Sequence, residues 1–395
     1  MPKLLQINVT ANSGSTGKIA EQIGGLAIDN CWESWIAYGR GVPKSRSELI
    51  RIGNDIDMRW HGIESRIFDN HGLASVKVTK HFIEQAKAIN PDIIHLHNIH
   101  GYYINYPLLF EYLKAWGGPV VWTLHDCWPF TGHCAYFMMS GCEKWKTGCH
   151  DCGNIHAYPK SLFRNRSEHN FTQKKSVFTS LGRNLTLVPV SQYVNSYLND
   201  SFFSDTNSIV IHNGIDLTKF QPCSRKRNLV LGVANVWEQR KGLFDFYRLR
   251  QELSTDYRIL LIGLSKSQIK RLPDGIDGIE RTESQEELAE LYSSAVALVN
   301  PTYEDNYPTV NLEAIACGTP VITYRTGGSP ESITPDIGIV VEQGDINGLV
   351  NGIKRASDGE FSVSACRAYA EANFNQKNCF KTYLDLYNSL IKQQS

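Results

Sequence analysis

The chain has 395 residues, which is too long for one ordinary hydrophobic core and predicts two domains of roughly 200 residues each. Forty basic residues balance forty acidic ones, so the net charge provides no long-range field for gathering phosphates, and we expect no nucleic-acid partner. The first residues contain too short an apolar run for a signal peptide, and no stretch of about 18 apolar residues follows, so we expect a cytoplasmic protein.

Short apolar runs alternate with helical patterns along the first half of the chain. Leu4 to Val9 predicts a strand that ends in a Ser/Gly/Thr turn before a helix. Further strands are expected at 93–96, 120–124 and 185–190, with helices at 106–116 and 162–181. This alternation predicts a parallel sheet that is covered by helices on both faces.

The second half repeats the pattern after a polar, basic stretch at 220–228. Its strands are expected at 229–234, 258–262, 295–299, 320–323 and 338–341. We therefore predict a first domain at 1–222 with a Cys-rich insertion at about 127–153, a second domain at 223–374, and a closing helix at 375–395 that crosses back to the first domain. Because parallel sheets bind ligands beyond the carboxyl ends of their strands, two facing domains predict a site in the cleft between them.

The most informative stretch runs from Asn300 to Val321 and is typical of a strand end, a polar loop, a helix and a new strand. Pro308 suits the first turn of that helix, where its missing N–H costs nothing. The free amides of the helix start favour a diphosphate or sugar hydroxyls. Asp305 in the loop and Glu313 in the helix add carboxylates that accept hydrogen bonds from a ribose or a hexose. The alternative is an acidic loop before an ordinary helix.

This stretch resembles the acidic motif of the large retaining glycosyltransferase family of the family-four type, which has the GT-B fold and includes many bacterial polysaccharide and lipopolysaccharide enzymes. In that family two glutamates stand eight residues apart. Here the pair is Asp305 and Glu313, with Glu304 as a substitute for the shorter first carboxylate. The resemblance implies that Asp305 contacts the donor sugar and Glu313 the ribose. We add three residues of the same segment to the predicted donor site: Asn306, Tyr307 and Thr309.

A second element lies after the first strand of the second domain, in Val233 to Gly242. The family usually has Gly-Arg, a short loop and Lys-Gly there, and Asn235 occupies the position of that arginine. The predicted donor-binding residues here are Asn235, Arg240 and Lys241. The last two are also predicted to be catalytic, together with Asp305 and His125. Two cations near a diphosphate stabilise the charge that develops as the nucleotide leaves, so we expect no metal cofactor for catalysis. A solvated Arg-Lys pair is the alternative.

In the first domain, the segment from Ser13 to Lys18 does not match a nucleotide-triphosphatase loop, because Asn12 and Ile19 stand where that motif needs a glycine and a hydroxyl. The segment resembles the family's glycine-rich first loop instead. Gly14 and Gly17 would let its backbone amides approach the donor phosphate or the acceptor.

Two strands of the first domain end in histidines. We predict that His125 donates a hydrogen bond to the sugar or phosphate, as the family resemblance implies, and that His97 and Asn98 lie on the acceptor side. Structural roles for both histidines are the alternative. Asp55 and Asp57 match the metal motif of another transferase fold, but they precede a helical pattern and are interpreted as capping residues.

The Cys-rich insertion contains four cysteines, Cys134, Cys142, Cys149 and Cys152, and one pair of them, Cys149 and Cys152, has the two-residue spacing that favours tetrahedral zinc. No strand or helix pattern organises this segment, so we expect a structural zinc to hold it. Reduced, buried thiols are the alternative.

The sequence thus predicts an α/β protein of two Rossmann-like domains with the GT-B fold. By resemblance it is a retaining hexosyltransferase that uses a UDP or GDP sugar and a saccharide or lipid-linked acceptor in the synthesis of exopolysaccharide or lipopolysaccharide. A sugar-nucleotide epimerase or phosphorylase of the same fold, and a non-catalytic zinc-stabilised scaffold, are the alternatives.

Peripheral contact with the inner membrane is a further expectation. A segment with basic and aromatic side chains could touch anionic lipids, although a solvated helix face is the competing interpretation. Its residues are Phe163, Arg164, Arg166, Phe171, Lys174 and Lys175.

Overall fold

The computed structural model describes residues 1–223 and 225–394, which divide into two compact units. The first unit comprises Met1–His212 and the segment from Phe380 onward, and the second comprises Asn213–Cys379. The first unit therefore ends earlier than the predicted boundary at 222. The cause is local: Ile215 N donates to the carbonyl oxygen of Phe374 (2.8 Å), which ties this stretch into the second unit before the polar segment begins.

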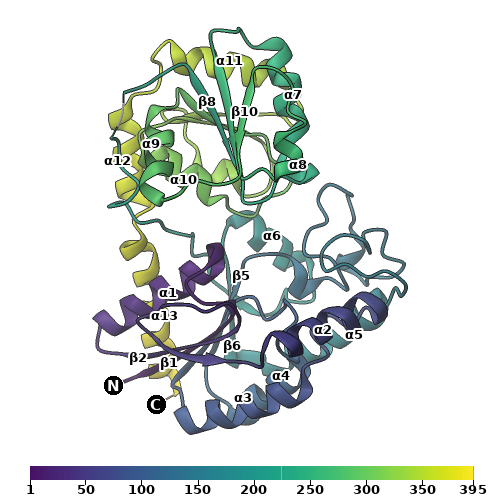
Figure 1. Cartoon of the computed structure of the whole chain (residues 1–395). Helices are drawn as coiled ribbons and strands as arrows, with labels where there is room; N and C mark the ends of the chain where they lie inside the picture. The colour runs from purple at the N-terminus through teal and green to yellow at the C-terminus, as the bar shows by residue number, and fades with distance from the viewer. Residues whose placement is uncertain (224, 395) are drawn as a thin grey trace. The chain divides into compact units, whose positions relative to one another are not determined.

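The first unit is built on a parallel sheet with strand order β3-β2-β1-β4-β5-β6-β7 (Figure 1). Its strands are β1 (Lys3–Thr10), β2 (Glu33–Arg40), β3 (Glu48–Arg51), β4 (Ile93–Leu96), β5 (Val120–Leu124), β6 (Leu185–Pro189) and β7 (Asn207–Ser208). Its helices are α1 (Gly14–Asp29), α2 (Asp55–Phe68), α3 (Val76–Ile89), α4 (Tyr106–Trp116), α5 (Ser167–Phe178) and α6 (Gln192–Asp200), joined by most of α13 (Gln376–Gln394).

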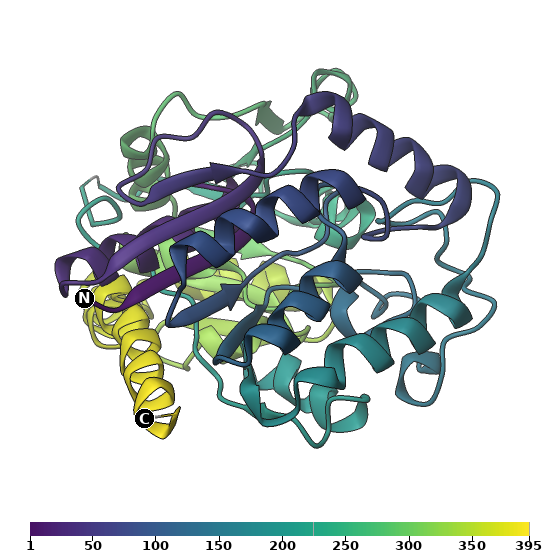
Figure 2. The same ribbon diagram turned by 90° about the horizontal axis from the view of Figure 1, so that it is seen from below.

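One face of this sheet carries polar side chains and lies against α1 and α13. Gln6 Nε2 donates to the carbonyl oxygen of Ala20 in α1 (2.8 Å). His95 Nδ1 is hydrogen-bonded to the hydroxyl of Tyr387 in α13 (2.6 Å), and His95 Nε2 to Thr123 Oγ1 (2.8 Å). Figure 2 shows α13 in yellow beside the purple N-terminal strands. The C-terminal helix thus satisfies polar groups that the sheet would otherwise bury without partners.

The opposite face of the same sheet is apolar and aromatic. Trp122 of β5 contacts the ring of Phe110 in α4 (centroids 5.7 Å apart) and that of Phe178 in α5 (4.9 Å). Alternate residues of a strand point to opposite faces, so Trp122 and Thr123 separate the two environments. Large aromatic side chains of this kind supply most of the buried apolar area of a core.

The second unit has a parallel sheet with strand order β10-β9-β8-β11-β12-β13. Its strands are β8 (Leu229–Val233), β9 (Arg258–Ile262), β10 (Ile276–Ile279), β11 (Ala297–Asn300), β12 (Val321–Tyr324) and β13 (Gly338–Val341). Its helices are α7 (Leu243–Glu252), α8 (Lys266–Ile269), α9 (Gln285–Ser294), α10 (Thr309–Ala316), α11 (Ile346–Ser357) and α12 (Val363–Asn373).

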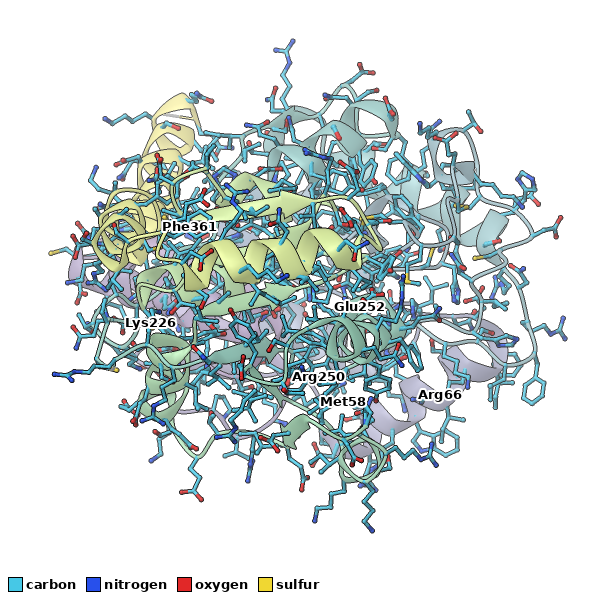
Figure 3. The ribbon with its side chains drawn as sticks, turned by 90° about the horizontal axis from the view of Figure 1, so that it is seen from above. Met58, Arg66, Lys226, Arg250, Glu252 and Phe361 are labelled. Carbon is cyan, nitrogen blue, oxygen red and sulfur yellow. The ribbon has the colours of Figure 1, made fainter. Side chains whose placement is uncertain are left out.

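Arg250, labelled in Figure 3, closes the turn between α7 and β9. Its guanidinium donates to the carbonyl oxygens of Tyr257 (2.7 Å) and Ser254 (2.7 Å). These carbonyl groups belong to the turn after the helix, so the arginine fixes the path of the chain from α7 to β9. The α/β pattern expected from the sequence is confirmed in both units.

The expected helix at 162–181 begins later, at Ser167, and ends at Phe178. Residues before it are held as a loop, because the Ser161 hydroxyl donates to the carbonyl oxygen of Arg164 (2.7 Å). Asp57 caps α2 as expected, where it forms a capping box with Asn54. Within residues 1–223 and 225–394, no helix has the length and apolar character needed to cross a bilayer.

Replacing Tyr387 with phenylalanine should lower the free energy of unfolding by about 1–3 kcal/mol, because His95 Nδ1 would be left buried without a partner. Equilibrium denaturation measures this change. Lys381→Gln, at an exposed position of the same helix, is the control and should leave stability nearly unchanged. Equal stability of Tyr387→Phe and the wild type would contradict the role given to α13.

Candidate functional site

In the second unit, the loop between β11 and α10 is fixed by hydrogen bonds to the loops on either side of it. Tyr303 N donates to the carbonyl oxygen of Arg240 (2.7 Å), and the Thr302 hydroxyl donates to the same oxygen (3.2 Å). On the other side, Gly328 N donates to the carbonyl oxygen of Asp305 (3.1 Å). The loop is therefore held between the segments that follow β8 and β12.

Two glycines make this close packing of backbones possible. Gly242 has φ 75°, and a Cβ atom there would lie 2.1 Å from the carbonyl oxygen of Pro301. Gly327 has φ 56°, and its Cβ would lie 1.8 Å from the carbonyl oxygen of Asp305. Both distances are far below contact, so any side chain at either position would displace the loop.

Lys241 and Asp305 form an ion pair at this loop, and their side chains are 19% and 16% exposed. Arg240 approaches the same loop: its Nε donates to Glu238 Oε2 (3.0 Å) and its Nη1 to the carbonyl oxygen of Glu304 (3.4 Å). The structure thus brings one predicted carboxylate and both predicted cations together. Partial burial means that solvent screens these charges less than it would at the surface.

Helix α10 begins at Thr309, with Pro308 at the N-cap position and no side-chain cap. The expected place of Pro308 inside the first turn is wrong by one residue, since its ψ of 113° is extended rather than helical. Asn306 and Tyr307, just before it, are buried. The first amides of α10 therefore stay directed at the end of the loop without a side-chain oxygen from the cap residue.

Glu313 lies in the second turn of α10, where its Oε2 accepts a hydrogen bond from the Tyr292 hydroxyl (2.9 Å). Burial, together with the Glu313 carboxylate, raises the pKa of Tyr292 well above its usual range, so the tyrosine stays a donor. Asn235 lies exposed in the turn after β8. Glu304 is 5% exposed.

A network of buried polar side chains, not predicted from the sequence, lies next to the loop between β11 and α10. Asn300 Nδ2 donates to Asn311 Oδ1 (2.9 Å), and Asn311 Nδ2 donates to the Ser329 hydroxyl (2.9 Å). Thr323 Oγ1 is hydrogen-bonded to that hydroxyl (2.7 Å). Asn311 could have indicated this network, because it is a polar residue on the otherwise apolar side of a short helix. The network fixes α10 relative to β11 and β12.

In the first unit, the glycine-rich loop leads directly into α1. Gly14 has φ 65° and starts the helix, and Asn12 N donates to the carbonyl oxygen of Gly17 (2.9 Å). A Cβ on Gly17 would lie 2.6 Å from Thr10 Oγ1, so the helix start can approach β1 only because this residue is glycine.

His97 and His125, at the ends of β4 and β5, are directly hydrogen-bonded, with His97 Nδ1 3.1 Å from His125 Nε2. Their rings are nearly parallel, at 15°. The other nitrogen of His97 is 3.1 Å from Gln6 Oε1. Asn98 follows, and its N–H donates to Asn8 Oδ1 (3.2 Å). The structure therefore groups the predicted histidines and Asn98 beside β1.

The hydrogen bonds assign the tautomers of this histidine pair. Gln6 uses its Nε2 to reach the carbonyl oxygen of Ala20, so its Oε1 must accept from His97 Nε2–H. Neutral His97 then accepts at Nδ1, and His125 donates from Nε2–H. Neutral His125 then carries its lone pair at Nδ1, which differs from the expectation that this residue is a donor.

Burial keeps the histidine pair neutral. Desolvation lowers the pKa of His125 to about 4, although its ring is partly exposed, and lowers the pKa of His97 well below its usual range. The next residue, Asp126, is buried, accepts from Trp128 N (3.0 Å) and lies 2.8 Å from His100 Nε2. Burial alone would raise the pKa of Asp126, but these contacts outweigh it and the net shift is downward.

The four cysteines of the insertion lie within electrostatic reach of one another. A hydrogen bond from the Cys134 thiol lowers the pKa of Cys152, and burial raises that of Cys149 to about 11. Among the residues that the structure describes, no three metal-ligating side chains already stand together as a metal centre requires. The zinc expectation stays a prediction.

The basic surface expected at 163–175 is partly wrong. Phe163 is 77% exposed, and Arg164 and Lys175 are exposed, but Phe171 and Lys174 are buried. Lys174 Nζ points inward, where it donates to the carbonyl oxygen of Trp128 (2.8 Å). The long alkyl stem of lysine allows it to line a core, which composition alone does not reveal.

Both halves of the chain match described glycosyltransferase families. Residues 35–219 match "Glycosyltransferase Family 4", and residues 227–358 match "Glycosyl transferases group 1". The colanic acid biosynthesis glycosyl transferase WcaC of Escherichia coli K12 is 25% identical over 98% of this chain and 100% of its own length. The MMP alpha-(1->4)-mannosyltransferase of Mycolicibacterium hassiacum is 31% identical over 37% of this chain and 38% of its own.

Solved structures agree with the fold. Sucrose-phosphate synthase of Thermosynechococcus elongatus superposes with a TM-score of 0.72 at 18% identity, covering 100% of both chains. HepE of Anabaena, solved in complex with UDP, superposes with a TM-score of 0.64 at 14% identity over 98% of this chain and 100% of its own. These likenesses show the two-domain GT-B fold.

The stability of the protein should fall as the pH drops from about 6.5 to about 4. The folded-state pKa of His125 is depressed, so the unfolded chain takes up a proton first and unfolding is favoured across this window. The unfolding free energy, measured at pH 7.5 and 5.0, should decrease less in His125→Gln than in the wild type. Parallel pH dependences would contradict a buried, neutral His125.

Proposed function

Because the chain belongs to the family-four type of glycosyltransferases with the GT-B fold, we propose that it transfers a hexose from a nucleoside diphosphate sugar to a saccharide or lipid-linked saccharide, with retention of configuration, in surface polysaccharide synthesis. The family makes it a glycosyltransferase of glycan synthesis. We propose three further properties: a nucleoside diphosphate sugar as the donor, retention of configuration, and a saccharide or lipid-linked saccharide as the acceptor.

The observation that carries the proposal is the pairing of Lys241 with Asp305 beside Arg240, at the start of α10. A lysine ammonium has three donors, so Lys241 can hold Asp305 and a phosphate oxygen at the same time. Helix amides add a partial positive charge at the same place. This combination suits a diphosphate next to a sugar whose hydroxyls bond to Asp305.

Glu313 is proposed to bind the ribose. Its Oε2 accepts from Tyr292, which fixes the carboxylate and leaves its remaining acceptor positions for vicinal hydroxyls. Asn306, Tyr307 and Thr309 complete the donor side through the segment that leads into α10. Asn235 stands where the family has an arginine, so Arg240 and Lys241 carry the positive charge at this site.

In the proposed reaction the acceptor oxygen attacks the anomeric carbon from the face that the phosphate leaves. The bond from that carbon to the phosphate oxygen breaks, the bond to the acceptor oxygen forms, and the hydroxyl proton of the acceptor passes to the departing phosphate. The transition state resembles an oxocarbenium ion. Arg240 and Lys241 stabilise the negative charge that gathers on the diphosphate, and no metal is invoked.

In the first unit, we assign His125 to contact with a sugar hydroxyl. Gln6 and His97 are positioning residues, since they act only by fixing the tautomer of His125. Asn98 and the loop of Gly14 and Gly17 are proposed to contact the acceptor or the donor phosphate. Peripheral contact with the membrane that holds a lipid-linked acceptor remains part of the proposal.

Replacing Lys241 with alanine should lower kcat by about 10²–10³-fold, because one fixed cation is lost where charge develops. Product formation from a panel of UDP- and GDP-hexoses measures this and identifies the donor. Lys266→Ala, an exposed lysine of the same unit, is the control and should keep the wild-type rate. Wild-type turnover in Lys241→Ala would refute the assignment. Conversion of the donor without an acceptor would indicate an epimerase.

Replacing Glu313 with alanine should mainly raise the KM for the donor, because a contact to the ribose is made equally in the ground state and the transition state. Steady-state kinetics at varied donor concentration separates KM from kcat. Glu290→Ala, an exposed glutamate of α9, serves as the control. A loss confined to kcat would move Glu313 from ribose binding to the reacting centre.

A further inference from the structure

The irregular insertion that follows β5 is poor in secondary structure but rich in sulfur. Between Thr131 and Asn154 the structure records only one short 3-10 helix, Lys144–Lys146, among the described residues. Four cysteine thiols gather here: those of Cys134, Cys142, Cys149 and Cys152. A loop of this kind has few backbone hydrogen bonds to hold it, so its shape needs another source of stability.

Backbone amides already point at two of these sulfurs. Gly132 N donates to Cys149 Sγ (3.1 Å), and Asn154 N donates to the sulfur of Cys152. A Cβ on Gly132 would lie 2.7 Å from the Cβ of Cys149, so only glycine permits this approach. Hydrogen bonds to sulfur favour the thiolate over the thiol, which is the form that ligates metals.

A buried lysine lies beside the sulfurs. Lys174 is 2% exposed, and its Nζ donates to the carbonyl oxygens of Trp128 (2.8 Å) and Thr131 (3.0 Å), 3.5 Å from the centre of the Trp128 ring. No ion pair involving Lys174 is present among the described residues. Its charge acts on Cys149 and Cys134. Buried charges are retained when an opposite charge compensates them, and thiolates would supply it here.

A buried histidine supplies an independent sign of a missing partner. His133 Nδ1 is 2.7 Å from Asp69 Oδ1, while Nε2 is buried and has no hydrogen-bond partner. His133 is 2% exposed and acts electrostatically on Cys152. A buried ring nitrogen without a hydrogen-bond partner indicates that a polar group or an ion belongs in this region.

We propose that Cys134, Cys142, Cys149 and Cys152 bind one zinc ion as four thiolates, with Lys174 as the buried counter-charge and His133 near Cys152. Four thiolates around Zn²⁺ carry a net charge of −2, and a protonated Lys174 would offset one unit of it. Each thiol that ligates loses its proton to solvent. Within residues 1–223 and 225–394 no three metal-ligating side chains stand together in the arrangement of a metal centre, so the proposed site requires rotation of cysteine side chains to bring the four sulfurs onto the ion.

The centre would be structural, and it would hold the insertion against the rest of the first unit. Leu162 N donates to the carbonyl oxygen of Arg66 in α2 (2.7 Å), a residue labelled in Figure 3. Ala135 N donates to Tyr158 O (3.1 Å), and Cys127 N donates to Ala135 O (3.0 Å). Through Cys127 the insertion reaches the segment that begins with His125. The proposal does not depend on the proposed transfer reaction.

The first test is the metal content of the full-length protein, purified under reducing conditions without an affinity metal. Plasma mass spectrometry should find about one zinc per chain, and fewer in Cys149→Ser and Cys152→Ser. Cys31→Ser, at an exposed cysteine, is the control and should keep the zinc. A wild-type chain that contains no zinc and takes up none when zinc is added overturns the proposal, as does iron in its place.

Cobalt replacement provides a test that does not rely on the folding of any variant. Wild-type protein loaded with Co²⁺ should show the intense sulfur-to-cobalt charge-transfer bands and visible bands of a tetrahedral tetrathiolate. Spectra of an octahedral ion bound by oxygen would overturn the ligand set.

The counter-charge has a matched pair of variants. Lys174→Met should weaken zinc binding by about 10–100-fold in competition with a chelator, as loss of an outer-shell partner does. Lys175→Met changes the neighbouring, exposed lysine and should leave the affinity unchanged. Equal affinities in the two variants would overturn the role given to Lys174.

Discussion

The parallel direction of the strands is the constraint on which the rest of the structure depends. In a parallel sheet every carboxyl end lies at the same edge, so the loops that follow neighbouring strands are neighbours too. In the second unit, β8, β11 and β12 are adjacent, and the segments after them contribute Lys241, Asp305 and Gly327 to one small region. In the first unit, β1, β4 and β5 do the same for Gly14, His97 and His125. Parallel strands thus bring together candidate site residues that are far apart in the sequence.

A second feature follows from the polar face of the first sheet. Parallel sheets are usually apolar on both faces, because helices cover them. Here Gln6, His95, His97 and Thr123 lie buried, and each has a partner with defined geometry. Such a network tolerates only neutral imidazoles and fixes their tautomers, so the sheet determines which nitrogen of His125 is an acceptor. A network of this kind also specifies one arrangement of the covering helix.

The sequence predicted much of the architecture. The strands at 93–96, 120–124, 258–262 and 338–341 and the helix at 106–116 have the expected bounds, because each is a short apolar or periodic run between clear turns. Strand β2 was missed, since Glu33–Arg40 mixes polar and aromatic residues, and β3 and β10 are short and half-exposed. The loop between β11 and α10 and the cations Arg240 and Lys241 were identified from the sequence. Their ion pair, the contact between His97 and His125 and the burial of Lys174 were not, because each depends on packing between distant segments.

The order of the chain has one more consequence. Most of α13 belongs to the first unit, yet in the sequence it follows the whole of the second unit. During synthesis Thr123 and His95 lack their hydrogen-bond partners until Tyr383 and Tyr387 have been made. A nascent chain that stalls before α13 would therefore leave histidine and threonine side chains of the first sheet exposed to water.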